Sequence, residues 1–262
     1  MIDGIVIYNE KDLEKNKDYI NWLIEEGQRK NLNIKLVLEN NINEIKYDFK
    51  FALNRSRNFN ITYKLEEEGI RVFNNYKFCI LGNDKLIAYD YIGTLGLKYP
   101  KVYRSLKEMD ENKKIIEKPK NGHGGVNIKI IENIMESNFS KNVYQEYIED
   151  YIGDIRFYII NNNIEHAVIR APKNNNLVSN FTKGGEVKIY NYSFKEEIII
   201  SKILNNIKID FGGIDFLLLK NGEILFNEFE DAVGSRMLSY LGINDTMEKY
   251  INHILNEVKG MR

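Results

Sequence analysis

Short apolar runs alternate with amphipathic stretches along the first 75 residues of the chain. Apolar runs of four to seven residues predict buried strands, and apolar residues at helical spacing predict helices between them. The predicted elements are strands at 5–8, 34–38, 49–55 and 71–73, with helices at about 12–30 and 60–68. A strand, a helix and a second strand at the start of a chain predict a parallel α/β unit.

The pattern changes after residue 75, where strands follow one another with fewer helices between them. No repeat and no low-complexity linker separates the two parts, so we expect them to share an interface. The predicted strands lie at 114–118, 126–130, within 139–148, and at 155–160, 164–170, 213–219 and 223–229, and the predicted helices at 84–93, 195–206 and 247–258.

Composition excludes several classes of protein. The 262 residues include 37 Lys and Arg against 38 Asp and Glu, so the basic excess of a nucleic-acid-binding protein is missing. A single cysteine, Cys79, rules out an intramolecular disulfide. No apolar run approaches the roughly 20 residues that span a bilayer, and no signal peptide is recognisable. We therefore expect a cytoplasmic globular protein with neither nucleic-acid nor membrane partners.

A glycine-rich turn between two predicted strands, at 117–126, could bind an anion. Gly122, Gly124 and Gly125 would let backbone N–H groups approach a phosphate, and Lys118 and Lys120 add positive charge. The segment matches neither the P-loop pattern nor the dinucleotide-binding glycine pattern. A plain hairpin with glycine turns explains the same residues equally well.

Three carboxylates lie on the last two predicted strands. Asp215 interrupts an otherwise apolar strand, and a buried carboxylate needs a partner. Glu228 and Glu230 point to the same side of the following strand. Carboxylate oxygens converging from adjacent strands suit Mg²⁺, although a solvated edge strand would also carry Glu228 and Glu230.

The order of these features resembles the ATP-grasp superfamily, and within it the ribosomal-protein glutamate ligases and related carboxylate–amine ligases. The resemblance implies an ATP-grasp fold, α/β overall and α+β in the grasp part, with an N-terminal parallel α/β domain at 1–75. The grasp domain would cover 76–262, with a central lid subdomain at about 76–145 and a C-terminal subdomain at about 146–262. The matching segments are FALNR at 51–55, GNDK at 82–85, IIEKPKNGHGGV at 115–126, QEYIEDYIGDIR at 145–156, IR at 169–170, SNFTKGG at 179–185, GGIDFLL at 212–218 and FNEFEDAVG at 226–234.

The resemblance also implies roles for individual residues. Lys85 and Lys118 would hold the phosphates of ATP, and Asp154 would hold its ribose. Arg170 and Asn180 would face the phosphates and the reacting carboxylate. Asp215, Glu228 and Glu230 would bind Mg²⁺, with Mn²⁺ as an alternative. The flexible loop that closes over the phosphates would be formed by Gly122, His123, Gly124 and Gly125, and the adenine would contact Gln145, Glu146, Tyr147 and Ile148.

The sequence departs from the family pattern around the substrate. The usual Glu-x-Asn is here Glu228-Phe229-Glu230, which adds a negative charge, and the usual Ser-Pro-Gly is Ala232-Val233-Gly234. Val178 stands where the glutamate ligases often have a basic residue. Candidate substrate contacts are Arg55, Arg156, Ser235 and Arg236, of which Arg236 would bind a substrate carboxylate or form a salt bridge with Asp231.

The implied activity is ATP-dependent joining of a small-molecule or peptide carboxylate to an amine through an acyl phosphate. The same fold also serves kinases that phosphorylate a hydroxyl group, and it could bind ATP without catalysis, so both alternatives stay open. For oligomeric state, a homodimer is the default expectation.

Overall fold

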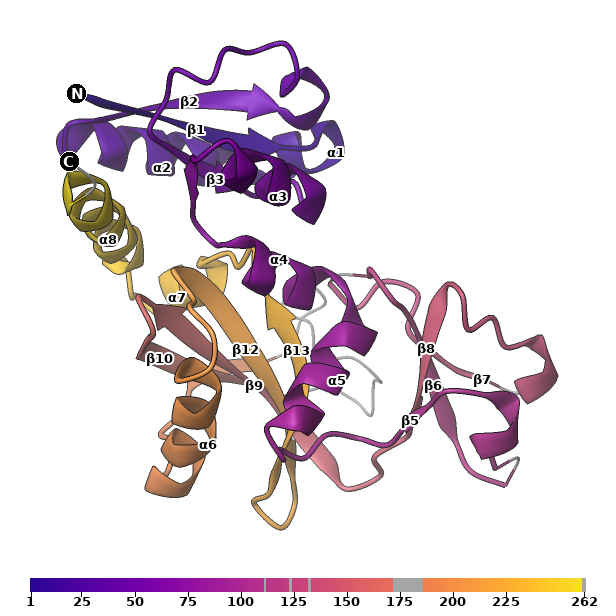
Figure 1. Ribbon diagram of the computed structural model, residues 1–262. Coiled ribbons are helices and arrows are strands. Elements are labelled where there is room, and N and C mark those ends of the chain that lie inside the picture. The colour runs from indigo at the N-terminus through magenta and orange to yellow at the C-terminus, as the bar shows by residue number, and fades with distance from the viewer. Residues whose placement is uncertain (111, 123, 132, 172–185, 261–262) are drawn as a thin grey trace.

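The computed structural model describes residues 1–110, 112–122, 124–131, 133–171 and 186–260, and its strands form three sheets (Figure 1). The first sheet, in the order β2-β1-β3-β4, is parallel throughout. Its helices pack on both faces, with α2 on one side and α3 on the other. The elements are β1 (Ile2–Tyr8), α1 (Glu10–Leu13), α2 (Lys17–Arg29), β2 (Leu32–Leu38), β3 (Phe51–Asn54), α3 (Phe59–Glu67) and β4 (Arg71–Val72).

Two helices connect this unit to the rest of the chain. Both α4 (Tyr76–Asn83) and α5 (Lys85–Thr94) pack on the last strand of the largest sheet. Asp84 separates the two helices, and its side chain accepts hydrogen bonds from the N–H groups of Leu86 and Ile87. This N-cap satisfies donors that α5 would otherwise leave unpaired, and it fixes Lys85 as the first residue of the helix.

The second sheet is antiparallel, in the order β5-β8-β6-β7, and lies apart from the parallel sheet (Figure 1). Side chains alternate across it: Tyr144 packs with Tyr103 and Ile115 in a small core, while Gln145 faces the opposite way. Its strands are β5 (Val102–Tyr103), β6 (Ile115–Pro119), β7 (Lys129–Ile131) and β8 (Asn142–Glu146).

The third sheet, in the order β11-β10-β9-β12-β13, carries different chemistry on its two faces. Ile155, Phe157 and Ile159 of β9 lie on the face that α4, α5 and α6 (Phe194–Leu204) cover. Arg156 and Tyr158 alternate with them onto the other face. The strands are β9 (Tyr151–Ile160), β10 (Asn163–Ala171), β11 (Glu186–Ile189), β12 (Phe211–Leu219) and β13 (Ile224–Glu230).

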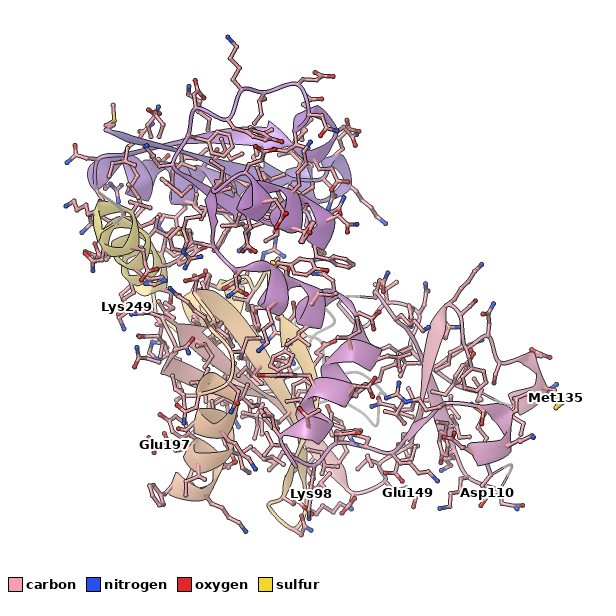
Figure 2. The ribbon with its side chains drawn as sticks, viewed as in Figure 1. Lys98, Asp110, Met135, Glu149, Glu197 and Lys249 are labelled. Carbon is pink, nitrogen blue, oxygen red and sulfur yellow. The ribbon has the colours of Figure 1, made fainter. Side chains whose placement is uncertain are left out.

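The end of the chain returns to its beginning. After α7 (Arg236–Tyr240), helix α8 (Thr246–Gly260) packs on α2, beside the parallel sheet (Figure 1). Tyr250 and Ile254 of α8 share one buried core with Leu23 of α2 and with Tyr158 of the third sheet. Charged side chains lie at the outer edges of the molecule, as Figure 2 shows for Lys98, Asp110, Glu149, Glu197 and Lys249. Among the described residues, no helix is both long and apolar enough to cross a membrane.

The predicted fold class is confirmed, and each predicted element has a counterpart with shifted ends. The sequence pattern missed α4, α7, β5 and β11. The boundary at residue 75 stays a prediction, and α8 belongs by its packing to the N-terminal unit as much as to the C-terminal one.

Candidate active site

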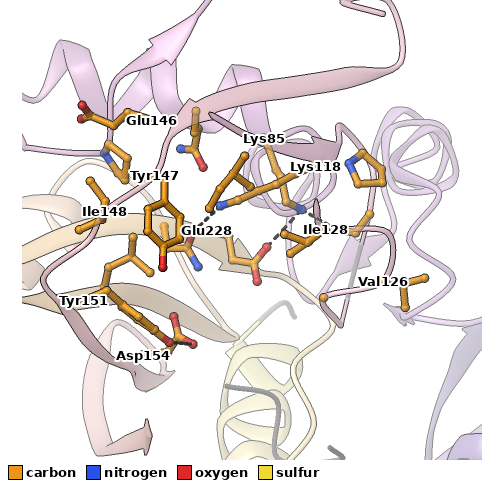
Figure 3. A pocket seen from close by; sticks show the side chains of 18 of the residues that line it. Lys85, Lys118, Val126, Ile128, Glu146, Tyr147, Ile148, Tyr151, Asp154 and Glu228 are labelled. Atoms are coloured by element: carbon orange, nitrogen blue, oxygen red, sulfur yellow. Dashed lines mark hydrogen bonds and ion pairs between the residues drawn. The ribbon is translucent and has the colours of Figure 1, made fainter. Parts of the chain in front are cut away.

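A cavity lies between the second and third sheets, and it gathers most of the residues predicted from the sequence (Figure 3). Lys85, Lys118 and Glu228 lie together at its centre, while Tyr147, Ile148, Tyr151 and Asp154 follow one side. Its lining is Lys85, Pro100, Ile116, Lys118, Pro119, Gly122, Gly125, Val126, Ile128, Gln145, Glu146, Tyr147, Ile148, Tyr151, Asp154, Arg170, Leu217, Asn227 and Glu228.

Two buried lysines enter the cavity from different elements. Lys85, at the start of α5, donates from Nζ to the carbonyl oxygen of Gly122 at 2.5 Å and lies 3.1 Å from Oε2 of Glu228. Lys118 of β6 donates from Nζ to Oδ1 of Asn227 at 3.0 Å. Burial lowers the pKa of Lys118 to about 8, although the Glu228 carboxylate opposes the shift. Both ammonium groups therefore face a site that suits an anion.

A bulge in β13 explains why Asn227 and Glu228 both line the cavity. Asp215 pairs with Glu228 in the sheet register, whereas Phe216 pairs with Phe226, so Asn227 is the extra residue in its strand. A bulge interrupts the alternation of faces and re-aims the side chains beside it. Strict alternation would have turned Asn227 away, and this is why the sequence did not single out the partner of Lys118.

The three predicted metal ligands come together on β12 and β13. One carboxylate oxygen from each of Asp215, Glu228 and Glu230 lies within 4.8 Å of the others. Burial alone would raise the pKa of Glu228, but the charges of Lys85 and Lys118 outweigh it and lower this pKa to about 2. Burial raises the pKa of Glu230. Hard oxygen donors at this spacing fit a divalent cation such as Mg²⁺.

Two arginines compensate the fully buried carboxylate of Asp215. Arg156 donates from Nε and Nη2 to its two oxygens, each at 2.7 Å, and Nη2 of Arg170 donates to Oδ2 at 2.7 Å. Arg156 also lies 3.0 Å from Glu230. The carboxylate of Asp215 raises the pKa of both arginines against the opposing effect of burial. Asp215 therefore has the charge partners that a carboxylate buried in an apolar strand needs. A metal ion bound by Asp215 would share this carboxylate with two guanidinium groups.

Most of the predicted nucleotide contacts line the rest of the cavity, but Gly124 does not. Gly124 and Gly125 have φ angles of 66° and 65°, which favour glycine. Asp154 accepts a hydrogen bond from the Tyr151 hydroxyl at 2.8 Å. Glu146 lines the cavity, but its side chain accepts from the backbone N–H of Lys101 at 2.8 Å. His123 and Asn180 lie outside the described residues, as does Val178.

None of the predicted substrate residues, Arg55, Arg156, Ser235 and Arg236, belongs to the cavity lining. Arg55 is buried and donates to backbone carbonyls of Ala232 and Val233. Ser235 is buried just before α7. Arg236 donates to the carbonyl oxygen of Lys15 at 2.7 Å, and this contact takes the place of the salt bridge with Asp231 that the sequence suggested. Arg55 and Arg236 are thus engaged within the protein, and their binding of substrate is not supported by these contacts.

Comparisons with known proteins agree with this geometry. The family model of the RimK-like ATP-grasp domain matches residues 90–254. "Uncharacterized protein MG011" of Mycoplasma genitalium is 27% identical over 252 residues, which are 91% of this chain and 87% of that protein.

Among solved structures, the D-alanine–D-alanine ligase of Bacillus anthracis complexed with ATP superposes with a TM-score of 0.75 at 16% identity, covering 100% of this chain and 98% of that one. The RimK domain protein ATP-grasp of Sphaerobacter thermophilus gives a TM-score of 0.70 at 13% identity, with 96% and 98% covered. At sequence identities this low, the two superpositions show that the fold is shared and nothing further.

Proposed function

Because this chain belongs to the RimK-like ATP-grasp family, and so to the ATP-dependent ligases, we propose that it joins a carboxylate to an amine through an acyl phosphate. The observation that carries the proposal is the meeting of Lys85, Lys118 and Glu228 in one cavity, beside two further carboxylates. Cations that hold phosphates and oxygen ligands that hold a divalent metal are the two requirements of phosphoryl transfer from ATP.

Each group has a defined place in the proposed reaction. An oxygen of the substrate carboxylate attacks the γ-phosphorus of ATP and ADP leaves, after which the amine nitrogen attacks the acyl carbon, phosphate leaves and the nitrogen releases a proton. Lys85 and Lys118 neutralise the charge that develops on the phosphates. Mg²⁺, when bound by Asp215, Glu228 and Glu230, would supply further positive charge. Arg170 lines the same cavity and stabilises the oxyanion formed at the acyl carbon.

The proposal is tested by measuring inorganic phosphate release from Mg-ATP with pooled amino acids and short peptides. We expect release that requires both a carboxylate and an amine. Glu228→Gln should lose at least about 100-fold of this activity, since it removes a charged ligand of the metal that neutralises the reacting phosphates. Glu223→Gln is the matched control, because Glu223 precedes the same strand but pairs with the exposed Lys98.

Two results would reject parts of the proposal. ADP formation without stoichiometric phosphate would indicate transfer to a hydroxyl group and a kinase. Normal turnover in Glu228→Gln would remove the metal-ligand assignment.

A further inference from the structure

One hydrogen bond joins the two walls of the cavity. Nζ of Lys118, on β6 of the second sheet, donates to Oδ1 of Asn227, on β13 of the third sheet, at 3.0 Å. Both residues line the cavity, and Lys118 is only 8% exposed. A buried ammonium group needs an acceptor, so Asn227 determines where the end of this lysine lies.

The backbone at the bulge in β13 is held at two successive residues. The Tyr89 hydroxyl donates to the carbonyl oxygen of Asn227 at 2.7 Å, and the N–H of Phe226 donates to the carbonyl oxygen of Lys98 at 2.9 Å. Tyr89 is fully buried, and its ring stacks on Tyr99 with a centroid distance of 5.3 Å. The side chain of Asn227 therefore reaches the cavity from a fixed position.

Asn227 gives Lys118 a neutral partner, whereas Lys85 has a charged one. Nζ of Lys85 lies 3.1 Å from Oε2 of Glu228. An amide oxygen accepts a hydrogen bond without carrying a charge, and an ammonium group has three N–H donors. The contact with Asn227 thus uses one donor of Lys118 and does not cancel its positive charge. The ammonium group is directed by this contact and stays available to an anion.

We propose that Asn227 is a positioning residue, which directs the ammonium group of Lys118 at the nucleotide phosphates without neutralising its charge. This inference rests on the proposed ligase activity, because it needs a bound nucleotide. It gives a role to a residue that binds neither phosphate nor metal in that proposal. Without the amide oxygen, the ammonium group would turn to another acceptor or lose its proton, and either change would weaken nucleotide binding.

A double-mutant cycle tests whether the effect of Asn227 depends on Lys118. Calorimetry measures Mg-ADP binding to the unmodified protein, to Asn227→Leu, to Lys118→Met and to the variant with both substitutions, so that no turnover is needed. Leucine is similar in size to asparagine and has no hydrogen-bonding group. Asn227→Leu should bind Mg-ADP about 10- to 100-fold more weakly, the range expected for losing a hydrogen bond to a charged group. The double variant should bind no more weakly than Lys118→Met.

The cycle separates positioning from a purely structural role. If Asn227 only stabilised β13, its substitution would weaken Mg-ADP binding equally in the unmodified protein and in Lys118→Met. The double variant replaces a buried polar pair by two apolar side chains and leaves neither group without a partner. If Asn227→Leu alone does not fold, equal Mg-ADP affinity of Lys118→Met and the double variant is the expected result, and a further loss of about 10-fold in the double variant overturns the inference.

Two further variants test the charge and the location of the amide. Asn227→Asp keeps an acceptor at the same position but adds a negative charge, so Mg-ADP should bind at least about 10-fold more weakly. Asn60→Leu is the control, because it removes an exposed amide from α3, outside the cavity lining. This control should leave the affinity for Mg-ADP unchanged.

Three results would overturn the inference. These are an unchanged Mg-ADP affinity in Asn227→Leu, an equal loss of affinity with and without Lys118, or an unchanged affinity in Asn227→Asp. Failure of the unmodified protein to bind Mg-ADP would reject the proposed function and this inference with it. Normal binding by the unmodified protein, without coupling between the two residues, would reject this inference alone.

Discussion

Lys118 illustrates how one buried charge can serve binding at a cost to stability. Its pKa of about 8 lies below the usual value near 10.4, because burial disfavours the charged form. Mg-ATP supplies negative charge that favours the ammonium form. We therefore expect the affinity for Mg-ATP to weaken as the pH rises through about 8. Lys118→Arg, which keeps its charge, should retain affinity to higher pH, and equal pH profiles for the two proteins would contradict this account.

The same residue predicts a pH-dependent stability. Below pH 8 both the folded and the unfolded chain hold the Lys118 proton, so the cost of burying the charge is fully present. Between about pH 8 and 10.4 the unfolded chain binds more protons, and stability rises with pH. Lys118→Met should thus raise the free energy of unfolding at pH 7 by about 1–3 kcal/mol, with the gain vanishing near pH 10. Denaturant unfolding of the two ligand-free proteins at pH 7 and pH 10 measures this difference in the free energy of unfolding. A Lys118→Met variant that is less stable at pH 7 would contradict the prediction.

At the scale of single residues, the sequence indicated which side chains need a partner or could bind a ligand. It did not indicate which residues they contact. Asp215 in an apolar strand required compensation, and the structure supplies Arg156 and Arg170. Arg55 followed a strand end and therefore suggested a substrate contact, yet the carbonyls of Ala232 and Val233 engage it. Those partners lie more than 170 residues away, and no local pattern indicates such a contact.

Among the elements, α4 positions the first lysine of the site. Its Gly82 packs directly on the turn after β13, where an added Cβ would lie 2.8 Å from Cβ and 2.9 Å from the backbone nitrogen of Asp231. Backbone atoms cannot move aside as the end of a flexible side chain can. Gly82→Ala should therefore push α4 away, costing about 1–3 kcal/mol of stability, and displace Lys85 three residues later.

Thermal melting and ATP titration check the Gly82 prediction together. The melting temperature and the affinity for Mg-ATP should both fall in Gly82→Ala. Gly260→Ala near the end of α8 is the control, because no atom lies within 4 Å of the added Cβ. Equal melting temperatures and equal Mg-ATP affinities of the two variants would show that the close approach of Gly82 to Asp231 does not position α4.

The sequence missed elements for identifiable physical reasons. Helix α4 buries five of its eight residues, among them Phe78, Cys79 and Leu81, so it lacks the wide polar face that makes a helix recognisable from periodicity. Strand β5 has two residues, too few to show alternation. Long strands such as β9 and β12 were recognised from their apolar runs.

For the whole molecule, one buried carboxylate joins three distant parts of the chain. Oδ1 of Asp210, the residue before β12, lies 2.5 Å from Nη2 of Arg71 in β4 and 2.8 Å from Nε2 of His253 in α8. Asp210 has no exposed surface. These contacts connect the parallel sheet, helix α8 and the third sheet. They therefore hold the N-terminal unit against the rest of the protein.

Asp210→Asn should lower the free energy of unfolding by about 3–5 kcal/mol, since it breaks the shorter of the two ion pairs of the largely buried Arg71, whose other partner is Glu257 at 3.4 Å, and also removes the charge beside His253. Asp90→Asn breaks an ion pair with Arg104 in which the carboxylate is 64% exposed, and it should cost less than about 1 kcal/mol. Urea unfolding of both variants compares them. Similar losses would mean that the buried cluster does not join the parts of the molecule as proposed.

The acyl phosphate is the central claim, and isotope transfer tests it most directly. A carboxylate substrate found by phosphate release is labelled with ¹⁸O in its carboxyl group and incubated with Mg-ATP and the amine. Since the carboxylate oxygen attacks phosphorus and leaves with it, each phosphate released should carry one ¹⁸O, as mass spectrometry would show. Phosphate without label would mean that water, and not the carboxylate, receives the phosphoryl group, and the ligase mechanism proposed for this site would be wrong.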